Sequence, residues 1–147
     1  MATTTATITL SSSDLLSDNL SLSATTTLNK GGTTATGLDQ FRMERFKIAT
    51  GTQFDLIEAT TAASEDANYV YICNKNTDVT HYVIISIYDV VIGRLYAGDW
   101  MFMPWDSDVV AVGAGGSAIE VQAYVAAATL EYCLFHNGET KVASDDS

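Results

Sequence analysis

From residue 41 onward the chain is a series of short apolar runs separated by turn residues, and this spacing constrains the fold more than any other feature. The runs have the length of strands, and Gly, Asn and Asp are frequent in the breaks between them. Strands that recur about every 8–12 residues are typical of β-sandwiches and barrels. The pattern predicts strands at 46–48, 53–58, 68–73, 82–88, 90–96, 100–103, 109–112, 119–125 and 130–134. We therefore expect an all-β fold, either an antiparallel β-sandwich or a jelly-roll-like barrel.

Alternate positions within the predicted strands indicate which side chains form the core. The last two strands place their apolar residues on one face, whereas residues 82–88 are apolar on both faces, as in a central strand buried between two layers. The predicted core residues are Val83, Ile85, Ile87, Val121, Val125, Leu130, Tyr132 and Leu134.

Two segments also fit a short helix, which stays open as an alternative. In residues 12–20, Ser13 would serve as the N-cap of such a helix. In residues 39–47, helical spacing would align three side chains, Phe41, Arg45 and Ile48.

The composition changes near residue 37 and divides the chain into three predicted parts. Residues 1–37 hold 11 Thr and 6 Ser and no aromatic residue, so they carry too little apolar surface to fold alone. We interpret them as an extended N-terminal arm, with a flexible tail as the alternative. Residues 38–140 form the predicted β-sandwich, and residues 141–147 form an acidic C-terminal tail.

Apolar and hydroxyl residues alternate within the arm, which predicts strand-like segments. We expect such an arm to bind by strand addition, in which main-chain hydrogen bonds to a sheet edge give affinity and alternate side chains fill pockets. The side chains expected to fill the pockets are Ile8, Leu10, Leu15, Leu16, Leu20 and Leu22.

The charge balance argues against nucleic acids and membranes as partners. The chain holds 18 acidic and 7 basic residues, for a net charge of -11, whereas binding to DNA, RNA or anionic lipid depends on clustered Lys and Arg. No apolar run reaches the roughly 18 residues of a transmembrane helix. The N-terminus lacks the basic and apolar regions of a secretory signal. The one basic cluster, Arg42, Arg45 and Lys47, is expected to anchor the arm on an acidic protein surface.

No catalytic motif is recognisable, and we expect the protein not to be an enzyme. His81 and His136 stand at strand ends, without the G-x-S-x-G or reactive-cysteine signature of a hydrolase beside them. Cys73 and Cys133 each lie within an apolar run, which predicts two buried thiols rather than a disulfide.

Metal binding is not indicated either. Neither cysteine has a second Cys or His at the spacing of zinc ligands. Asp99, Asp106 and Asp108 could supply oxygen ligands, but they do not form the 12-residue loop of a calcium site. We expect no cofactor and no metal.

Both tryptophans of the chain lie within Trp100-Met-Phe-Met-Pro-Trp105. In a strand, Trp100 and Phe102 would face one way and the two methionines the other. A core position is the usual role of such residues, although Trp and Met are also enriched at the centres of protein interfaces. The candidate interface aromatics are Trp100, Phe102 and Trp105.

Three segments resemble small β-rich virion proteins of tailed bacteriophages. The stretch Gly93-Arg-Leu-Tyr-Ala-Gly-Asp-Trp-Met-Phe-Met-Pro-Trp is similar to their "Leu, x, Ala/Pro, Gly, acid, aromatic, apolar, Pro" segment, and Ile119-Glu-Val-x-x-Tyr-Val follows it. Tyr69-Val-Tyr-Ile-Cys-Asn-Lys-Asn resembles their strand and asparagine-rich turn. The Thr/Ser/Leu segment 7–23 is similar to their N-terminal arms, although this chain has only Pro104 where many such arms hold several prolines.

Within that class, the resemblance implies a capsid decoration, or cement, protein. Such a protein would be made in the host cytoplasm, bind the major capsid protein on the outside of the capsid lattice, commonly as a homotrimer, and stabilise the shell. A tail or head-fibre adaptor, or a receptor-binding virion protein, is the first alternative. A small carbohydrate-binding or cupin-like enzyme domain is an alternative from another class.

Overall fold

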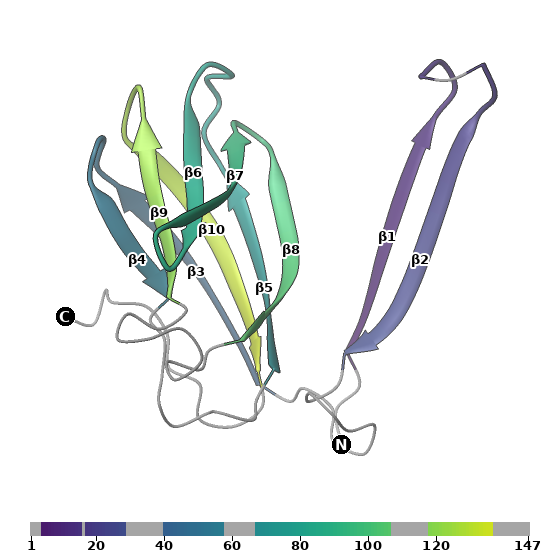
Figure 1. The fold of residues 1–147 in the computed structure, drawn as a ribbon, viewed down its shortest axis with the longest axis horizontal. Coiled ribbons are helices and arrows are strands. Elements are labelled where there is room, and N and C mark those ends of the chain that lie inside the picture. The colour runs from purple at the N-terminus through teal and green to yellow at the C-terminus, as the bar shows by residue number, and fades with distance from the viewer. Residues whose placement is uncertain (1–3, 16, 29–39, 58–66, 107–117, 137–147) are drawn as a thin grey trace.

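The structure is all-β, as the spacing of the apolar runs predicts (Figure 1). It is a computed structural model that describes residues 4–15, 17–28, 40–57, 67–106 and 118–136. Every regular element in these ranges is a strand: β1 Thr4–Ser12, β2 Leu20–Leu28, β3 Gln40–Ile48, β4 Gln53–Ile57, β5 Ala67–Asn74, β6 Tyr82–Ile87, β7 Val90–Tyr96, β8 Trp100–Asp106, β9 Ile119–Tyr124 and β10 Ala128–His136. The predicted strand at 109–112 and the predicted domain boundaries near 37 and 140 lie outside these ranges.

Strands β3 to β10 form two four-stranded antiparallel sheets with the order of a jelly roll. One sheet has the order β3-β10-β5-β8 and the other the order β4-β9-β6-β7. Counted from β3, these are the first, eighth, third and sixth strands, and the second, seventh, fourth and fifth. This order distinguishes the jelly roll, with its two Greek keys, from a sandwich of sequential hairpins. The first and last strands of the sandwich, β3 and β10, are therefore neighbours in one sheet.

The core lies between the two sheets and is built mainly by alternation, with an interruption at the register shift in β4, where the consecutive Leu56 and Ile57 are both buried. Along β10, Leu130, Tyr132 and Leu134 are fully buried, and from the facing sheet Val83 and Ile85 of β6 are fully buried as well. The other fully or almost fully buried residues of the core cluster are Ile48, Leu56, Ile57, Val70, Ile72, Leu95, Trp105, Ile119, Val121, Ala123 and Ala128. This confirms the predicted core except at two positions.

The two exceptions lie at strand ends. Ile87 is only partly buried, although it packs against the core cluster. Val125 was expected in the core, and this prediction is wrong. Strand β9 ends at Tyr124, and Val125 stands in the following turn with φ 74° and 64% exposure. A left-handed turn residue cannot continue the alternation of the strand before it.

Both helical alternatives are wrong. Residues 40–48 form β3, which pairs along its whole length with β10, so the β pattern of this segment prevails over its helical spacing. In the other segment, residues 12–20, the pairing of β1 with β2 runs from Thr4↔Leu28 to Ser12↔Leu20 and leaves only a short connection between the two strands. The Ser12 Oγ accepts a hydrogen bond from the Leu15 amide at 3.1 Å, and this bond forms a local turn in place of a helix N-cap.

Strand β8 continues past Pro104 to Asp106, although proline was expected to end it. Proline lacks an amide donor and is therefore tolerated in a strand mainly at a sheet edge. Strand β8 is the edge strand of its sheet, and Pro104 is opposite Tyr69 of β5 in the register. On the side of β8 that faces away from β5, no neighbouring strand requires a main-chain hydrogen bond from Pro104.

The fully buried Asn74 ties the two sheets together at one end of the sandwich. Its Nδ2 donates to the Leu95 carbonyl at 3.0 Å, and its Oδ1 accepts from the Asn76 amide at 3.0 Å. Its backbone donates to the Asp99 carbonyl and accepts from the Gly98 amide. Because β5 belongs to one sheet and β7 to the other, this single side chain fixes both the turn after β5 and the crossover after β7.

Replacing this side chain tests its role. We expect Asn74→Ala to lower the free energy of unfolding by about 1–3 kcal/mol, because the Leu95 carbonyl and the Asn76 amide would lose buried partners. Urea denaturation measures the change. Asn19→Ala, at an exposed position between β1 and β2, is the matched control and should change stability by less than about 0.5 kcal/mol. Equal effects of the two substitutions would contradict the role given to Asn74.

Candidate interaction surface

The outer side of the β3-β10-β5-β8 sheet is covered by aromatic and apolar side chains. The register places them in three adjacent rows. The first holds Phe41, Phe135, Tyr69 and Pro104, the second holds Met43, Cys133, Tyr71 and Phe102, and the third holds Cys73 and Trp100 beside Arg45 and Glu131. We call this surface the aromatic face. Its residues are Phe41, Met43, Tyr69, Tyr71, Trp100, Phe102, Cys133 and Phe135, with Cys73 and Pro104 at its borders.

Much of the aromatic face is accessible. The exposed fractions are 57% for Phe41, 51% for Met43, 53% for Trp100 and 36% for Phe102. Single exposed apolar residues are ordinary, whereas contiguous apolar patches commonly mark an interaction site. A row of such residues that crosses a whole sheet is therefore the leading candidate for a functional surface.

Ring contacts join the aromatic face across strands that are distant in sequence. The Phe41 and Phe135 ring centroids are 5.2 Å apart, and those of Phe135 and Phe102 are 6.3 Å apart. Phe102 also stacks on Tyr69 at 5.7 Å. Such pairs are worth about 0.5–1.5 kcal/mol beyond the burial of their area, so the rings are held in place before any partner binds.

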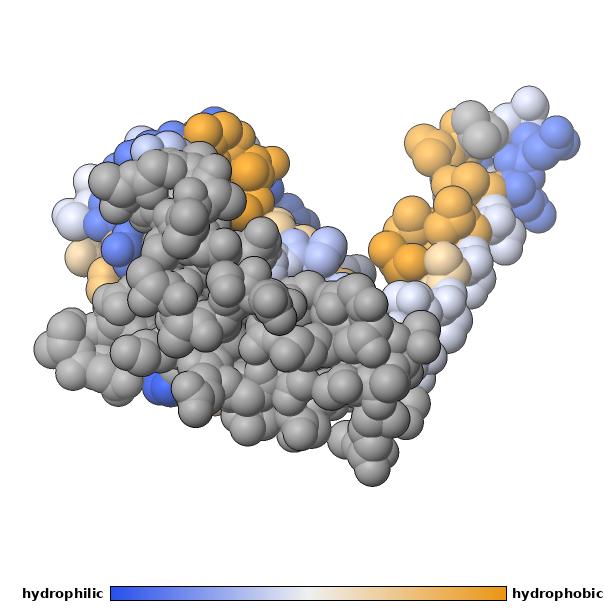
Figure 2. Space-filling model, turned by 60° about the horizontal axis from the view of Figure 1, so that its bottom comes forward, coloured by the Kyte–Doolittle hydropathy of each residue, from blue (hydrophilic) through white to orange (hydrophobic). Residues whose placement is uncertain are grey.

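The N-terminal hairpin of β1 and β2 is amphipathic. Because its strands pair residue by residue, the even-numbered positions of both strands share one side and the odd-numbered positions share the other. We call the apolar side the hairpin face; its apolar members are Ala6, Ile8, Leu10, Leu20, Leu22, Ala24 and Leu28. Figure 2 shows hydrophobic side chains gathered along the hairpin. The opposite side of the paired strands carries only Ser and Thr, where the Thr7 and Thr25 hydroxyls form a hydrogen bond of 2.9 Å.

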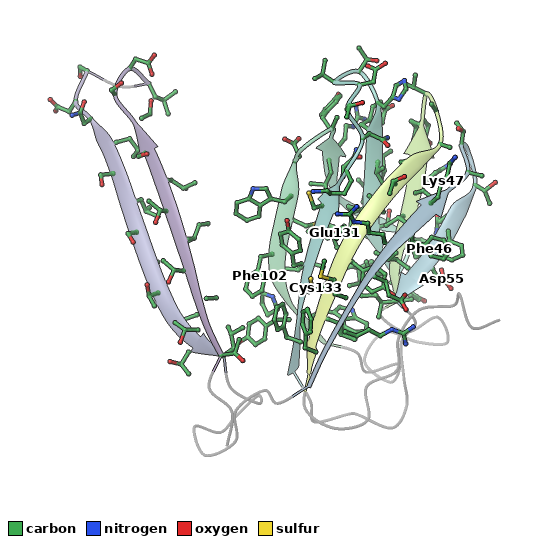
Figure 3. The ribbon with its side chains drawn as sticks, turned by 180° about the vertical axis from the view of Figure 1, so that it is seen from behind. Phe46, Lys47, Asp55, Phe102, Glu131 and Cys133 are labelled. Carbon is green, nitrogen blue, oxygen red and sulfur yellow. The ribbon has the colours of Figure 1, made fainter. Side chains whose placement is uncertain are left out.

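The hairpin face and the aromatic face border the same wedge-shaped space of about 680 Å³. The hairpin contributes Ile8, Ala24 and Leu28 to its lining, and the sheet contributes Trp100 and Phe102 among others. In Figure 3, Phe102 and Cys133 lie on the part of the sandwich nearer to the hairpin. The covering of the hairpin face changes along its length, since Leu28 is 1% exposed whereas Leu10 is 48% exposed.

The structure separates the three predicted anchoring bases. Arg45 and Lys47 lie on the outer side of β3, where the Arg45 Nε donates to Glu131 Oε2 at 2.7 Å. Arg42 is at a position of opposite parity and forms an ion pair with Glu44. Glu44 in turn accepts a 2.6 Å hydrogen bond from the buried Tyr132 hydroxyl. The three bases therefore do not form one basic surface, because the strand alternation directs Arg42 away from the other two.

The predicted interface aromatics also divide. Trp100 and Phe102 point outward from β8, as the strand alternation predicts. Trp105 is 3% exposed and belongs to the core cluster, so it cannot present its ring to a partner in this structure. Of the predicted pocket-filling residues, Leu15 lies at the end of the hairpin with 69% exposure, and Leu16 lies outside the described ranges.

Sequence analysis missed the contributions of β3, β5 and β10 to the aromatic face. The signal was present in Tyr69, Tyr71 and Cys73, which alternate with the core residues of β5 and make that strand apolar on both sides. Phe41 and Phe135 gave no such signal, because only the pairing of β3 with β10 brings them together.

A second aromatic cluster occupies the outer side of the other sheet. Tyr82 of β6 lies between Tyr96 and Tyr124, with ring centroids 5.3 Å from each. The Arg94 guanidinium lies over the Tyr82 ring, 4.2 Å from its centroid. This cation–π contact fixes a short platform of rings on the β9-β6-β7 part of the sheet.

The two histidines lie at opposite ends of the sandwich. No group of three or more His, Cys, Asp or Glu in these residues is placed to hold a metal ion. The His81 Nε2 lies 3.4 Å from Asp78 Oδ2 in the turn before β6. His136 ends β10 at the opposite end of the sandwich, because that turn lies beside Thr129 near the start of β10.

The thiols behave as the apolar runs predict. Cys73 and Cys133 are both free and buried. Burial, together with the nearby Glu131 carboxylate, raises the pKa of Cys133, so it stays a thiol at neutral pH rather than a reactive thiolate. Burial, with a hydrogen bond to Cys73, raises the pKa of Tyr71 to about 12. Tyr71 and Cys133, on the outer side of the sheet, are therefore both neutral at pH 7.

No family model, curated protein or solved structure matches the chain. The described part of the chain holds no helix that is long and apolar enough to cross a membrane. The arrangement of side chains therefore carries the functional argument.

The raised pKa of Tyr71 predicts a loss of stability at alkaline pH. The unfolded chain ionises this tyrosine near its ordinary pKa of 10.0, whereas the folded chain keeps it neutral until about pH 12. The free energy of unfolding must therefore fall as pH rises through this window. We expect Tyr71→Phe to lose less stability than the wild type between these pH values. Denaturant midpoints measure the stability of both proteins, and near neutral pH we expect stability to depend on pH in the same way in both. If the two proteins also lost stability equally above pH 10, the raised pKa of Tyr71 would be contradicted.

Proposed function

We propose that the chain is a structural binding protein that assembles with other protein surfaces and has no catalytic role. The observation that carries this proposal is the aromatic face, a contiguous and partly exposed apolar surface on a rigid sheet. Burial of one such side chain at an interface stabilises a complex by roughly 1.5–3 kcal/mol. Interfaces of this kind concentrate their binding energy in a few aromatic residues near the centre.

The specific role proposed is that of a capsid decoration protein, located on the outside of a phage capsid and bound to the major capsid protein. Two features support this role. The sequence resembles small phage virion proteins over most of its length, and the jelly roll is a fold that viral capsid domains use, although lectins and cupins use it too. A homotrimer is the proposed state on the lattice.

Copy number in the particle tests the proposal. In purified virions of the phage that encodes the chain, quantitative mass spectrometry should find it at a level comparable to the major capsid protein. A handful of copies per particle would instead indicate a tail or head-fibre adaptor or a receptor-binding protein. Absence from the particle would overturn the virion role altogether.

Substitutions on the aromatic face test its part in assembly on the particle. We expect Phe41→Ser with Trp100→Ser to lower the occupancy of the protein on particles that lack it by at least about 10-fold, because two exposed apolar anchors are lost. Val90→Ser with Val91→Ser is the matched control, since these residues are each 62% exposed but belong to the other sheet. Cryo-electron microscopy of the reconstituted particles measures occupancy. Equal occupancy for both variants would remove the aromatic face from the proposal.

The tyrosine platform on the other sheet supports a second candidate, a carbohydrate-binding domain. Ligand sites use aromatic surfaces together with a few fixed polar groups, and Tyr82 with Arg94 provides both. Retardation in affinity gels that contain polysaccharide tests this candidate. Tyr82→Ala should abolish retardation, and a wild-type protein that no polysaccharide retards would exclude it.

A further inference from the structure

Two apolar surfaces of this chain are only partly covered, the hairpin face and the aromatic face. We propose that the hairpin face of each chain packs on the aromatic face of a second copy of the same chain, so that the copies exchange their hairpins. The exchange uses the same aromatic face as the proposed function, but its test needs only the purified chain and no virion, so the two can fail separately.

The two surfaces match in length and chemistry. Strands β1, β2, β3 and β10 are each 9 residues long. At about 3.3 Å per residue, hairpin and sheet are both about 30 Å long. The hairpin face offers aliphatic side chains and the aromatic face offers mainly rings, so their contact would resemble the packing of two sheets in a sandwich.

Charge adds a preferred direction to this match. The hairpin face is uncharged along both strands, and the acids of the hairpin, Asp14 and Asp18, lie in the connection between them. The outer side of the β3-β10-β5-β8 sheet carries Arg45 and Lys47 toward one end of β3, and Glu131 of β10 pairs with Arg45 there, so the net positive charge at this end comes from Lys47. A hairpin that lies along the strands with its loop toward Lys47 brings opposite charges together. Complementary charges of this kind fix the register of an interface more than they add affinity.

The hairpin needs a covering surface that its own sheet supplies only in part. A two-stranded hairpin by itself is marginally stable at best in water. Within the chain, Leu28 is covered, but Ile8 is 42%, Leu10 is 48% and Leu22 is 47% exposed. Ile8 borders the 680 Å³ space between the hairpin and its own sheet, whereas Leu10 and Leu22 lie further along the hairpin and do not line that space.

A second copy meets this need in both directions. Each copy presents one open hairpin face and one open aromatic face, so an exchange covers both surfaces in every copy and leaves none over. Exchange of an identical element between protomers is a low-cost route to an oligomer, because each contact is one that a single chain could in principle make. The residues that define the two surfaces include no acidic side chain, which keeps repulsion between these residues low.

Paired substitutions in the full chain test the exchange. The hairpin variant Leu10→Asp with Leu22→Asp changes two residues that lie opposite each other on the hairpin face. Its matched control, Thr9→Asp with Ser23→Asp, changes an opposed pair on the Ser/Thr side. The face variant is Phe41→Asp with Trp100→Asp, and its control is Val90→Asp with Val91→Asp on the other sheet. Circular dichroism verifies folding, and Phe41→Ser with Trp100→Ser replaces a face variant that does not fold.

Sedimentation velocity at tens of micromolar protein gives the readout. We expect the wild type and both controls to sediment as an oligomer, and the hairpin and face variants to associate at least about 100-fold more weakly. An equimolar mixture of the two defective variants should form a heterodimer, because the intact hairpin of one still fits the intact face of the other.

Three results would overturn the exchange. A monomeric wild type would mean that the hairpin closes on its own sheet or awaits another partner. An oligomeric hairpin variant would mean that the aromatic faces stack directly on each other. A mixture that stays monomeric, although the wild type associates, would show that the hairpin of one copy does not bind the face of another.

Discussion

A sheet that is apolar on both sides must be covered on both sides, and most of this structure follows from that requirement. Strand β10 shows it most clearly. Leu130, Tyr132 and Leu134 fill the core, while Cys133 and Phe135 on the same strand face outward into the aromatic face. The second sheet covers the inner side. Among the described residues, the element that lies beside the outer side is the N-terminal hairpin, so the relation between hairpin and sheet is central to the proposed assembly.

The sequence was sufficient for the fold class because the alternation is strong where it matters. Residues such as Val83, Ile85 and Val121 carry the period of a buried strand and are buried. The sequence could not distinguish a simple sandwich from a jelly roll. That distinction depends on pairings such as β3 with β10, which join the first and last strands of the sandwich. The prediction of a core position for Val125 was wrong because a left-handed turn interrupts the alternation there, and the conformational propensity of valine does not indicate such a turn.

The candidate surface was harder to predict than the core. Trp100 and Phe102 are only two residues apart in the sequence and could be recognised, whereas Phe41 and Phe135 become neighbours only through strand register. The basic cluster shows the opposite error. Arg42 is close to Arg45 in sequence but pairs with Glu44 on the other side of the strand. Proximity along a strand is misleading for any property that depends on the face, because the face changes at every residue.

The Ser/Thr side of the hairpin has a consequence for solubility. Its hydroxyl groups hydrate the surface without ionising, so its affinity for water does not vary with pH or ionic strength. The rest of the protein relies on carboxylates, whose repulsion disappears when acid protonates them or salt screens them. Under such conditions the sandwich loses its electrostatic protection against precipitation, while the outer surface of the hairpin keeps its hydration. The Ser and Thr side of the hairpin therefore stays hydrated by groups whose charge state acid and salt do not change.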